Sequence, residues 1–290
     1  MDTRLFMTTV IGQTVQNFYT QSPFPDFELA RFNHREDLVK AARSLPKFLD
    51  QQIPVEASVI DIGTGTGQLS AFLSLKRRQV YGIDFSAGSL AKARALKTKL
   101  GLETWYLRQV DILDPDSVVS VGQKFDYVLC LGVLHHTGNP YQAFQNILTL
   151  LKPGGCLAIG LYNRFGRFPH WVRVILARTI FKNSDKVKDY FIRIQIGNTV
   201  DKERARDWWN DQYLHPHESA HSVGEVLRWF RANGIEYCQS LPPLGPCGQG
   251  AKNVWERTPS PSLWRRFYHQ LHWIKETNRD GGYWMTFGRF

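Results

Sequence analysis

Short apolar runs alternate with amphipathic stretches along the first half of the chain and predict an α/β fold. The apolar runs are typical of buried strands, and the stretches between them repeat their apolar residues at helical spacing. Ser86 and Gly101 have the residue types that begin and end a helix, and Asn139-Pro140 begins another. The predicted strands begin at Val59-Ile60 and continue with 80–84, 105–110, 125–131 and 156–161. This alternation favours a doubly wound, mostly parallel sheet.

A glycine-rich turn follows the first strand. Gly63, Gly65 and Gly67 alternate with other residues directly before a helix-like stretch. Glycine permits positive φ and lets a ligand lie against the backbone, so a strand, such a turn and a helix N-terminus together indicate a nucleotide site. A dinucleotide fingerprint would need glycine where the chain has Gln68. Asp84 ends the second strand, where a carboxylate can accept hydrogen bonds from ribose hydroxyls.

These motifs resemble those of class I S-adenosylmethionine (SAM)-dependent methyltransferases, in particular the type 11/12-like small-molecule group. The G-x-G-x-G spacing after Asp61, the third strand ending at Asp111-Ile112 and the turn 152–155 (Lys-Pro-Gly-Gly) carry the resemblance over residues 55–163. Thr64 is a mild departure, since the family more often has Cys or Ala there. The resemblance implies SAM as the cofactor, with Asp111 accepting from the adenine amino group and Ile112 packing on the ring. The residues expected to bind it are Asp61, Gly63, Gly65, Gly67, Asp84, Phe85, Asp111, Ile112 and Leu131.

The same resemblance predicts the elements of the second half. In this family a helix and an antiparallel pair of strands follow the fifth strand and complete a seven-stranded sheet. A capping box at Ser222–Glu225 begins the helix, and 235–241 and 283–290 are the expected strands. The predicted organisation is an N-terminal helical and aromatic segment over the cofactor site, a SAM-binding core, a helical lid insertion, and the end of the sheet with a second insertion. Their ranges are 1–54, 55–162, 163–221 and 222–290, the second insertion being 243–280.

Composition and charge indicate the cellular location and the kinds of binding partner that are expected. No apolar run approaches the roughly 20 residues of a membrane span, the first residues do not form a signal peptide, and four scattered cysteines suit reduced thiols, so we expect a cytoplasmic enzyme. The net charge of +10 lies mostly beyond residue 160, together with eight of nine tryptophans. This half could meet RNA, an anionic membrane or an anionic substrate, but a lid over the active site is favoured because no nucleic-acid motif accompanies the charge. The basic amphipathic stretch 165–181 is expected to pack on the domain rather than on a membrane.

Histidines and a tyrosine are the candidates for acceptor chemistry. His135 and His136 follow the fourth strand, where family members often place residues between cofactor and acceptor, and an imidazole suits removing a proton near neutral pH. Tyr162 ends the fifth strand as an expected wall of the acceptor site. His215 lies in the polar run 211–218, which either holds the acceptor or fixes the lid to the core. All four are candidate catalytic residues, and a structural role for each stays open.

No metal is expected. His217-Glu218-Ser219-Ala220-His221 matches the H-E-x-x-H pattern, but Pro216 precedes it and the next helix begins only at the capping box. The two histidines are therefore not expected on one helical face, as zinc would require.

The sequence favours a SAM-dependent methyltransferase acting on a small molecule. The alternative is a methyltransferase for RNA or protein that uses the basic C-terminal half. Other SAM-fold activities, such as aminopropyl transfer, and a non-catalytic SAM-binding module are weaker alternatives. The sequence names neither the acceptor atom nor the oligomeric state.

Overall fold

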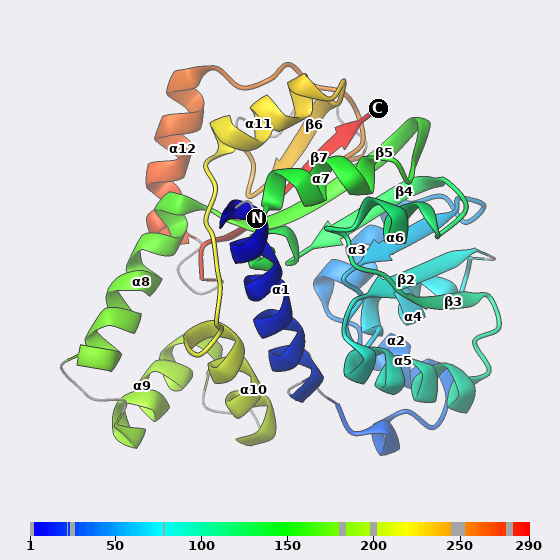
Figure 1. Cartoon of the computed structure of the whole chain (residues 1–290), viewed down its shortest axis with the longest axis horizontal. Coiled ribbons are helices and arrows are strands. Elements are labelled where there is room, and N and C mark those ends of the chain that lie inside the picture. The colour runs from blue at the N-terminus through cyan, green and yellow to red at the C-terminus, as the bar shows by residue number, and fades with distance from the viewer. Residues whose placement is uncertain are drawn as a thin grey trace.

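A computed structural model describes residues 3–21, 23, 27–77, 79–179, 184–197, 202–244, 253–276 and 281–290. Its strands are β1 (Val59–Ile62), β2 (Val80–Asp84), β3 (Trp105–Gln109), β4 (Phe125–Leu131), β5 (Leu151–Tyr162), β6 (Glu236–Leu241) and β7 (Tyr283–Arg289). They form one sheet in the order β3-β2-β1-β4-β5-β7-β6, in which only β7 runs antiparallel to its neighbours. The predicted seven-stranded, mostly parallel sheet is confirmed (Figure 1).

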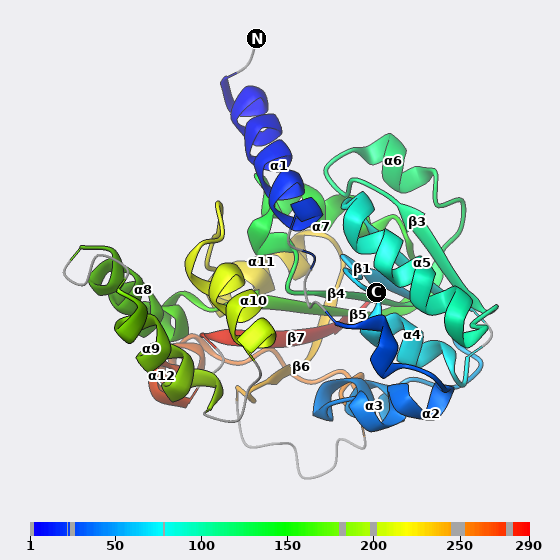
Figure 2. The same cartoon turned by 90° about the horizontal axis from the view of Figure 1, so that it is seen from below.

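Helices cover both faces of this sheet. They are α1 (Thr3–Gln21), α2 (Arg35–Ala41), α3 (Ser44–Gln52), α4 (Gln68–Ser74), α5 (Ala87–Leu100), α6 (Pro115–Val119), α7 (Pro140–Leu148), α8 (Arg164–Thr179), α9 (Asp185–Ile196), α10 (Lys202–Tyr213), α11 (Val223–Ala232) and α12 (Leu263–Glu276). Short 3-10 turns lie at Leu29–Arg31 and Leu134–His136. Figure 2 shows α2, α3 and α4 on one side of the sheet and α7 and α11 on the other.

The caps expected from the sequence form in the structure. Ser86 accepts a hydrogen bond from the Ser89 amide at 3.2 Å, and Gly101 ends α5 in the left-handed conformation. Ser222 and Glu225 form the capping box of α11. One expectation is wrong: residues 152–155 do not separate a helix from a strand, because β5 already begins at Leu151 and the pairing with β4 shifts register across them.

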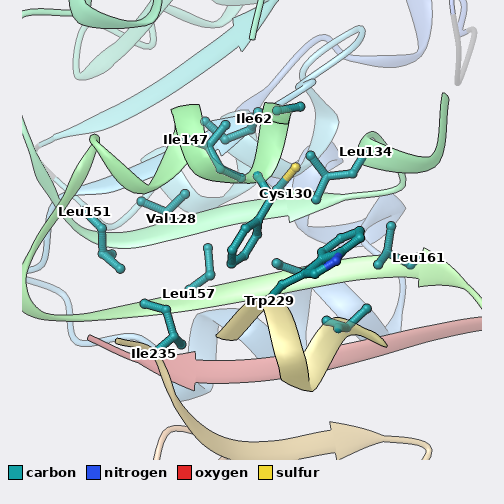
Figure 3. Packing of buried hydrophobic residues seen from close by; sticks show 14 of the residues in the cluster. Ile62, Val128, Cys130, Leu134, Ile147, Leu151, Leu157, Leu161, Trp229 and Ile235 are labelled. Carbon is teal, nitrogen blue, oxygen red and sulfur yellow. The ribbon is translucent and has the colours of Figure 1, made fainter. Parts of the chain in front are cut away.

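Two apolar cores lie against the two faces of the sheet. One packs β4 and β5 against α7 and α11, and Figure 3 shows Val128, Leu157, Ile147 and Trp229 meeting there. The other packs α3, α4 and α5 against the opposite face. Packing against both faces fixes the sheet, so the carboxyl ends of its parallel strands meet at one edge.

The insertion 163–221 holds α8, α9 and α10. These helices have a small core of their own, in which the Trp209 and Tyr213 rings stack with centroids 4.0 Å apart beside Phe191 and Ala177. Helix α8 begins one residue earlier than expected, and residues 180 and 181 at its expected end lie outside the described residues. Cys130, Cys156 and Cys238 are buried free thiols. None of the described helices combines the length and apolarity of a membrane span.

Candidate active site

A cavity of about 950 Å³ lies at the carboxyl ends of β1, β2, β4 and β5. Its wall includes eight of the nine residues expected to bind the cofactor: Asp61, Gly63, Gly65, Asp84, Phe85, Asp111, Ile112 and Leu131. The remaining one, Gly67, lies off the wall and begins α4 with φ +85°. A Cβ at Gly67 would come within 2.3 Å of the Trp105 ring, so this glycine shapes the turn by close packing.

The Asp84 carboxylate is held at the ends of β1 and β2 by backbone amides. Its oxygens accept from the Gly65 and Ser86 amides, each at 2.8 Å. A carboxylate has about four acceptor positions, so Asp84 keeps capacity for a ligand hydroxyl. Burial raises the pKa of Asp84, although these amides oppose the shift.

Asp61 lies deeper in the same wall. It is almost fully buried and accepts from the Thr64 hydroxyl at 2.8 Å. Burial raises its pKa to about 7, and the neighbouring charge of Asp84 acts in the same direction. A cationic ligand group beside Asp61 would favour its charged form.

The cavity wall continues from the cofactor residues to His135, His136 and Tyr162. His135 is buried between the other two rings, with centroids 4.2 Å from His136 and 4.3 Å from Tyr162. Neither of its ring nitrogens has a hydrogen-bond partner among the described residues. A buried polar group without a partner costs roughly 1–3 kcal/mol, which a ligand at this wall could recover.

Hydrogen bonds fix the tautomers of the next two histidines. The Nδ1 of His136 lies 3.1 Å from the His217 carbonyl, which can only accept, so Nδ1 carries the proton and Nε2 has a free lone pair. His215 lies behind His136, with ring centroids 3.9 Å apart, and does not line the cavity. Its Nδ1 accepts from the His217 amide. Burial lowers the pKa of both His136 and His215 to about 3, so both rings are neutral at physiological pH.

Helices α1 and α10 bring residues from distant parts of the chain to this wall. The Tyr19 hydroxyl donates to Asp211 at 3.1 Å, and both side chains line the cavity. Gln212 donates from its amide to the Tyr162 hydroxyl at 2.7 Å, which leaves the Tyr162 proton free to donate. Burial raises the pKa of Tyr162 and of Asp211. The polar run 211–218 thus contributes both to the cavity wall and to the attachment of the insertion 163–221.

Arg167, on α8, is the main residue of this attachment, although its sequence context does not distinguish it from the neighbouring basic residues. Its guanidinium is fully buried 3.7 Å from the centre of the Tyr162 ring and forms a bidentate ion pair with Glu218. It also donates to Gln212 and to the Gly281 carbonyl. Glu218 of the H-E-x-x-H pattern is therefore ion-paired with Arg167. Residues 214–220 are not helical, so the pattern does not lie on a helix. Among the described residues, no cluster of three metal-ligating side chains forms.

A glycine turn and carboxylates at the strand ends of a 3-2-1-4-5-7-6 sheet define a class I, Rossmann-like methyltransferase site. Residues 54–232 match the family model described as a methyltransferase domain. The chain therefore belongs to this family, in which SAM is the cofactor, as expected from the sequence.

Curated relatives and solved structures agree with this placement. A ubiquinone biosynthesis O-methyltransferase of Coxiella burnetii is 32% identical over 121 residues, covering 41% of this chain and 49% of that protein. An uncharacterized protein of Synechococcus is 25% identical over 201 residues, covering 62% of this chain and 47% of that protein. The chain spans about half the length of the curated relatives it matches.

The solved structures show the shared fold. PKMT2 of Rickettsia typhi superposes with a TM-score of 0.57 at 16% identity, covering 84% of this chain and 51% of that one. A SAM-dependent methyltransferase of Mesorhizobium loti gives 0.50 at 15% identity, covering 87% and 100%.

Proposed function

We propose that this protein transfers the methyl group of SAM to a small-molecule acceptor bound beside His135, His136 and Tyr162. The observation that carries the proposal is the continuity of one cavity from the cofactor residues to these three side chains. Its volume is near the upper end of the roughly 300–1,000 Å³ typical of small-molecule sites. Such a space suits a nucleoside cofactor and a small acceptor together.

The residues present fit the cofactor. Asp84 would hold the ribose, Asp111 and Ile112 the adenine, and Asp61 a cationic group of the methionine part. Bound SAM would supply an electrophilic methyl group on a sulfonium, whose departure as a neutral thioether needs no proton. The chain's own task is then to orient the acceptor and to exclude water.

His136 is the residue we propose as proton acceptor. Its Nδ1 proton is held by the His217 carbonyl, so Nε2 is the nitrogen able to take a proton. Burial keeps the ring neutral at physiological pH, so Nε2 is unprotonated and can accept a hydrogen bond or a proton from the acceptor. The O-methyltransferases among the relatives support oxygen as the acceptor atom.

His135 and Tyr162 are proposed to hold the acceptor, and His215 to support the His136 ring from behind. His135 lacks partners among the described residues, and Tyr162 retains a proton to donate. An acceptor with two polar groups would satisfy both. Tyr19, Asp211 and Gln212 complete this end of the cavity, and α1 would cover it.

The test is transfer of labelled methyl from SAM into a fractionated cell extract. Label in the small-molecule fraction supports the proposal. Label in RNA or protein would instead assign the acceptor to a macromolecule contacted by the basic C-terminal half. His136→Gln should lower turnover by roughly 10²–10⁴-fold and leave S-adenosylhomocysteine affinity unchanged. Full turnover in this variant would remove His136 from the chemistry.

A further inference from the structure

Helix α8 buries a mixed side, in which Arg167 and His170 lie beside the apolar Val174 and Ala177. Arg167 and His170 are buried against the domain, whereas Phe168, Trp171, Val172 and Ile175 are exposed, with Phe168 at 57% and Ile175 at 59%. These four residues recur every three or four positions and therefore form one stripe. A helix on a protein domain normally buries its apolar stripe, so this exposed one needs another partner.

Helix α12 has a second exposed stripe. Trp264, Phe267, Tyr268 and Leu271 follow the same spacing, and Trp264 is 82% exposed. The opposite side of α12 is anchored in the domain, where Gln270 accepts from Asn163 and Val223, and Trp273 is fully buried. The other side of α12 therefore anchors the helix in the domain.

The two stripes form one surface. Helices α8 and α12 pack on each other, and both views place them together at the end of the molecule away from β3 (Figures 1 and 2). Phe165 of α8 and Phe267 of α12 make an edge contact with ring centroids 6.2 Å apart. We call the eight exposed apolar residues of the two stripes the α8–α12 surface.

Basic side chains accompany this surface. Helix α8 has no acidic residue, and α12 has one, Glu276. Arg265 and Lys275 are exposed on α12, and Arg164 is exposed on α8, where it also lies 3.7 Å from the Glu225 carboxylate. Helices that lie in the interface of an anionic bilayer have this composition: tryptophan and tyrosine beside aliphatic residues, with arginine and lysine nearby.

We propose that the α8–α12 surface binds the headgroup and upper acyl region of anionic phospholipid membranes. Charge complementarity favours anionic lipid, with the basic groups contacting headgroups while the apolar stripes enter the acyl boundary. Val172, Ile175 and Leu271 argue against RNA, because aliphatic side chains neither stack on bases nor contact phosphates. The proposal concerns where the protein binds and holds whatever the methyl acceptor is.

Flotation of the full chain with vesicles tests this. Phosphatidylcholine vesicles that contain phosphatidylglycerol should bind the protein, and pure phosphatidylcholine vesicles should bind it roughly tenfold or more weakly. Added salt should weaken the binding without abolishing the apolar contribution. Equal affinity for both vesicle types, or no binding, would overturn the proposal.

Matched variants locate the contact. Ile175→Gln with Leu271→Gln should weaken vesicle binding by roughly tenfold or more, because two buried aliphatic side chains are lost from the contact. Val55→Gln with Val119→Gln is the control, since both residues are exposed apolar side chains on other parts of the surface. The control should bind vesicles like the unchanged protein, and both double variants should keep their melting temperature.

The same variants separate the membrane from other occupants. If sedimentation shows a dimer that Ile175→Gln with Leu271→Gln dissociates, the surface is an interface between copies and the proposal is wrong. It is also wrong if this variant and the control bind vesicles equally. Failure of the methyl-transfer assay would leave these results unaffected.

Discussion

Asp61 should make binding of the cofactor depend on pH. Burial raises its pKa to about 7 in the ligand-free protein. S-adenosylhomocysteine carries an α-ammonium group, which stays protonated below about pH 7.7 and would stabilise the ionised carboxylate. About a tenth of Asp61 is ionised at pH 6 and half at pH 7. Affinity for S-adenosylhomocysteine should therefore rise about fivefold over this interval, equivalent to about 1 kcal/mol.

Isothermal titration calorimetry measures this linkage directly. Titrations at pH 7 in buffers of different ionisation enthalpy should show release of about half a proton per ligand bound. Asp61→Asn should abolish both the release and the rise in affinity. Asp111→Asn is the control, because Asp111 lines the same cavity but is exposed. An affinity that does not change between pH 6 and 7, or the same slope in Asp61→Asn, would refute the reasoning.

Three further variants test the turn, the ribose site and the core. Asp84→Ala should weaken S-adenosylhomocysteine binding by roughly 10–100-fold with an unchanged circular dichroism spectrum, because charge-assisted hydrogen bonds are lost; unchanged affinity would mean that Asp84 does not hold the ligand. Gly67→Ala should lower the free energy of unfolding in urea by at least about 2 kcal/mol, since it combines positive φ with a clash against Trp105, and wild-type stability would contradict this. Asp50→Asn should cost about 3–5 kcal/mol in the same assay because it leaves the fully buried Arg77 guanidinium without its ion pair at 2.5 Å; a loss below 1 kcal/mol would show that the pair is replaceable.

The sheet, and the residues that line the cavity at its strand ends, could be predicted because their signals are local. In the first half of the chain, a strand, the turn after it and the helix cap that follows are all contained in one βαβ unit of about 30 residues. Ser86 and Gly101 bound a helix by their own backbone chemistry, and Asp84 follows from the strand that ends with it. The start of β5 was missed because its pairing with β4 begins at Phe125 and Leu151, a contact that no local pattern specifies.

The end of the cavity at His135, His136 and Tyr162 could be predicted only in part, because it is assembled from distant segments. Tyr19 and Asp211 are 192 positions apart, yet they share a hydrogen bond. The polar run 211–218 and the aromatic segment around Tyr19 indicated that these residues matter, but not that they meet. Arg167 had no signal beyond being one of several basic residues in an amphipathic stretch.

Helix α8 shows why periodicity cannot decide which side of a helix faces the domain. The stretch does pack on the domain, through a side that includes Arg167 and Ala177. The same packing leaves Phe168, Trp171 and Ile175 exposed. Arg167 can be buried because its guanidinium is hydrogen-bonded on several sides. Glu218 accepts two of its hydrogen bonds, Gln212 and the Gly281 carbonyl accept others, and its central carbon lies 3.7 Å from the centre of the Tyr162 ring. These interactions offset much of the desolvation penalty of burying the Arg167 charge. Without them, the side of α8 that carries Arg167 would be more stable facing water. Through Arg167, the buried side of α8 contacts Tyr162 and Gln212 in the cavity wall. The apolar residues on the other side stay exposed, where contact with an apolar partner is more favourable than contact with water.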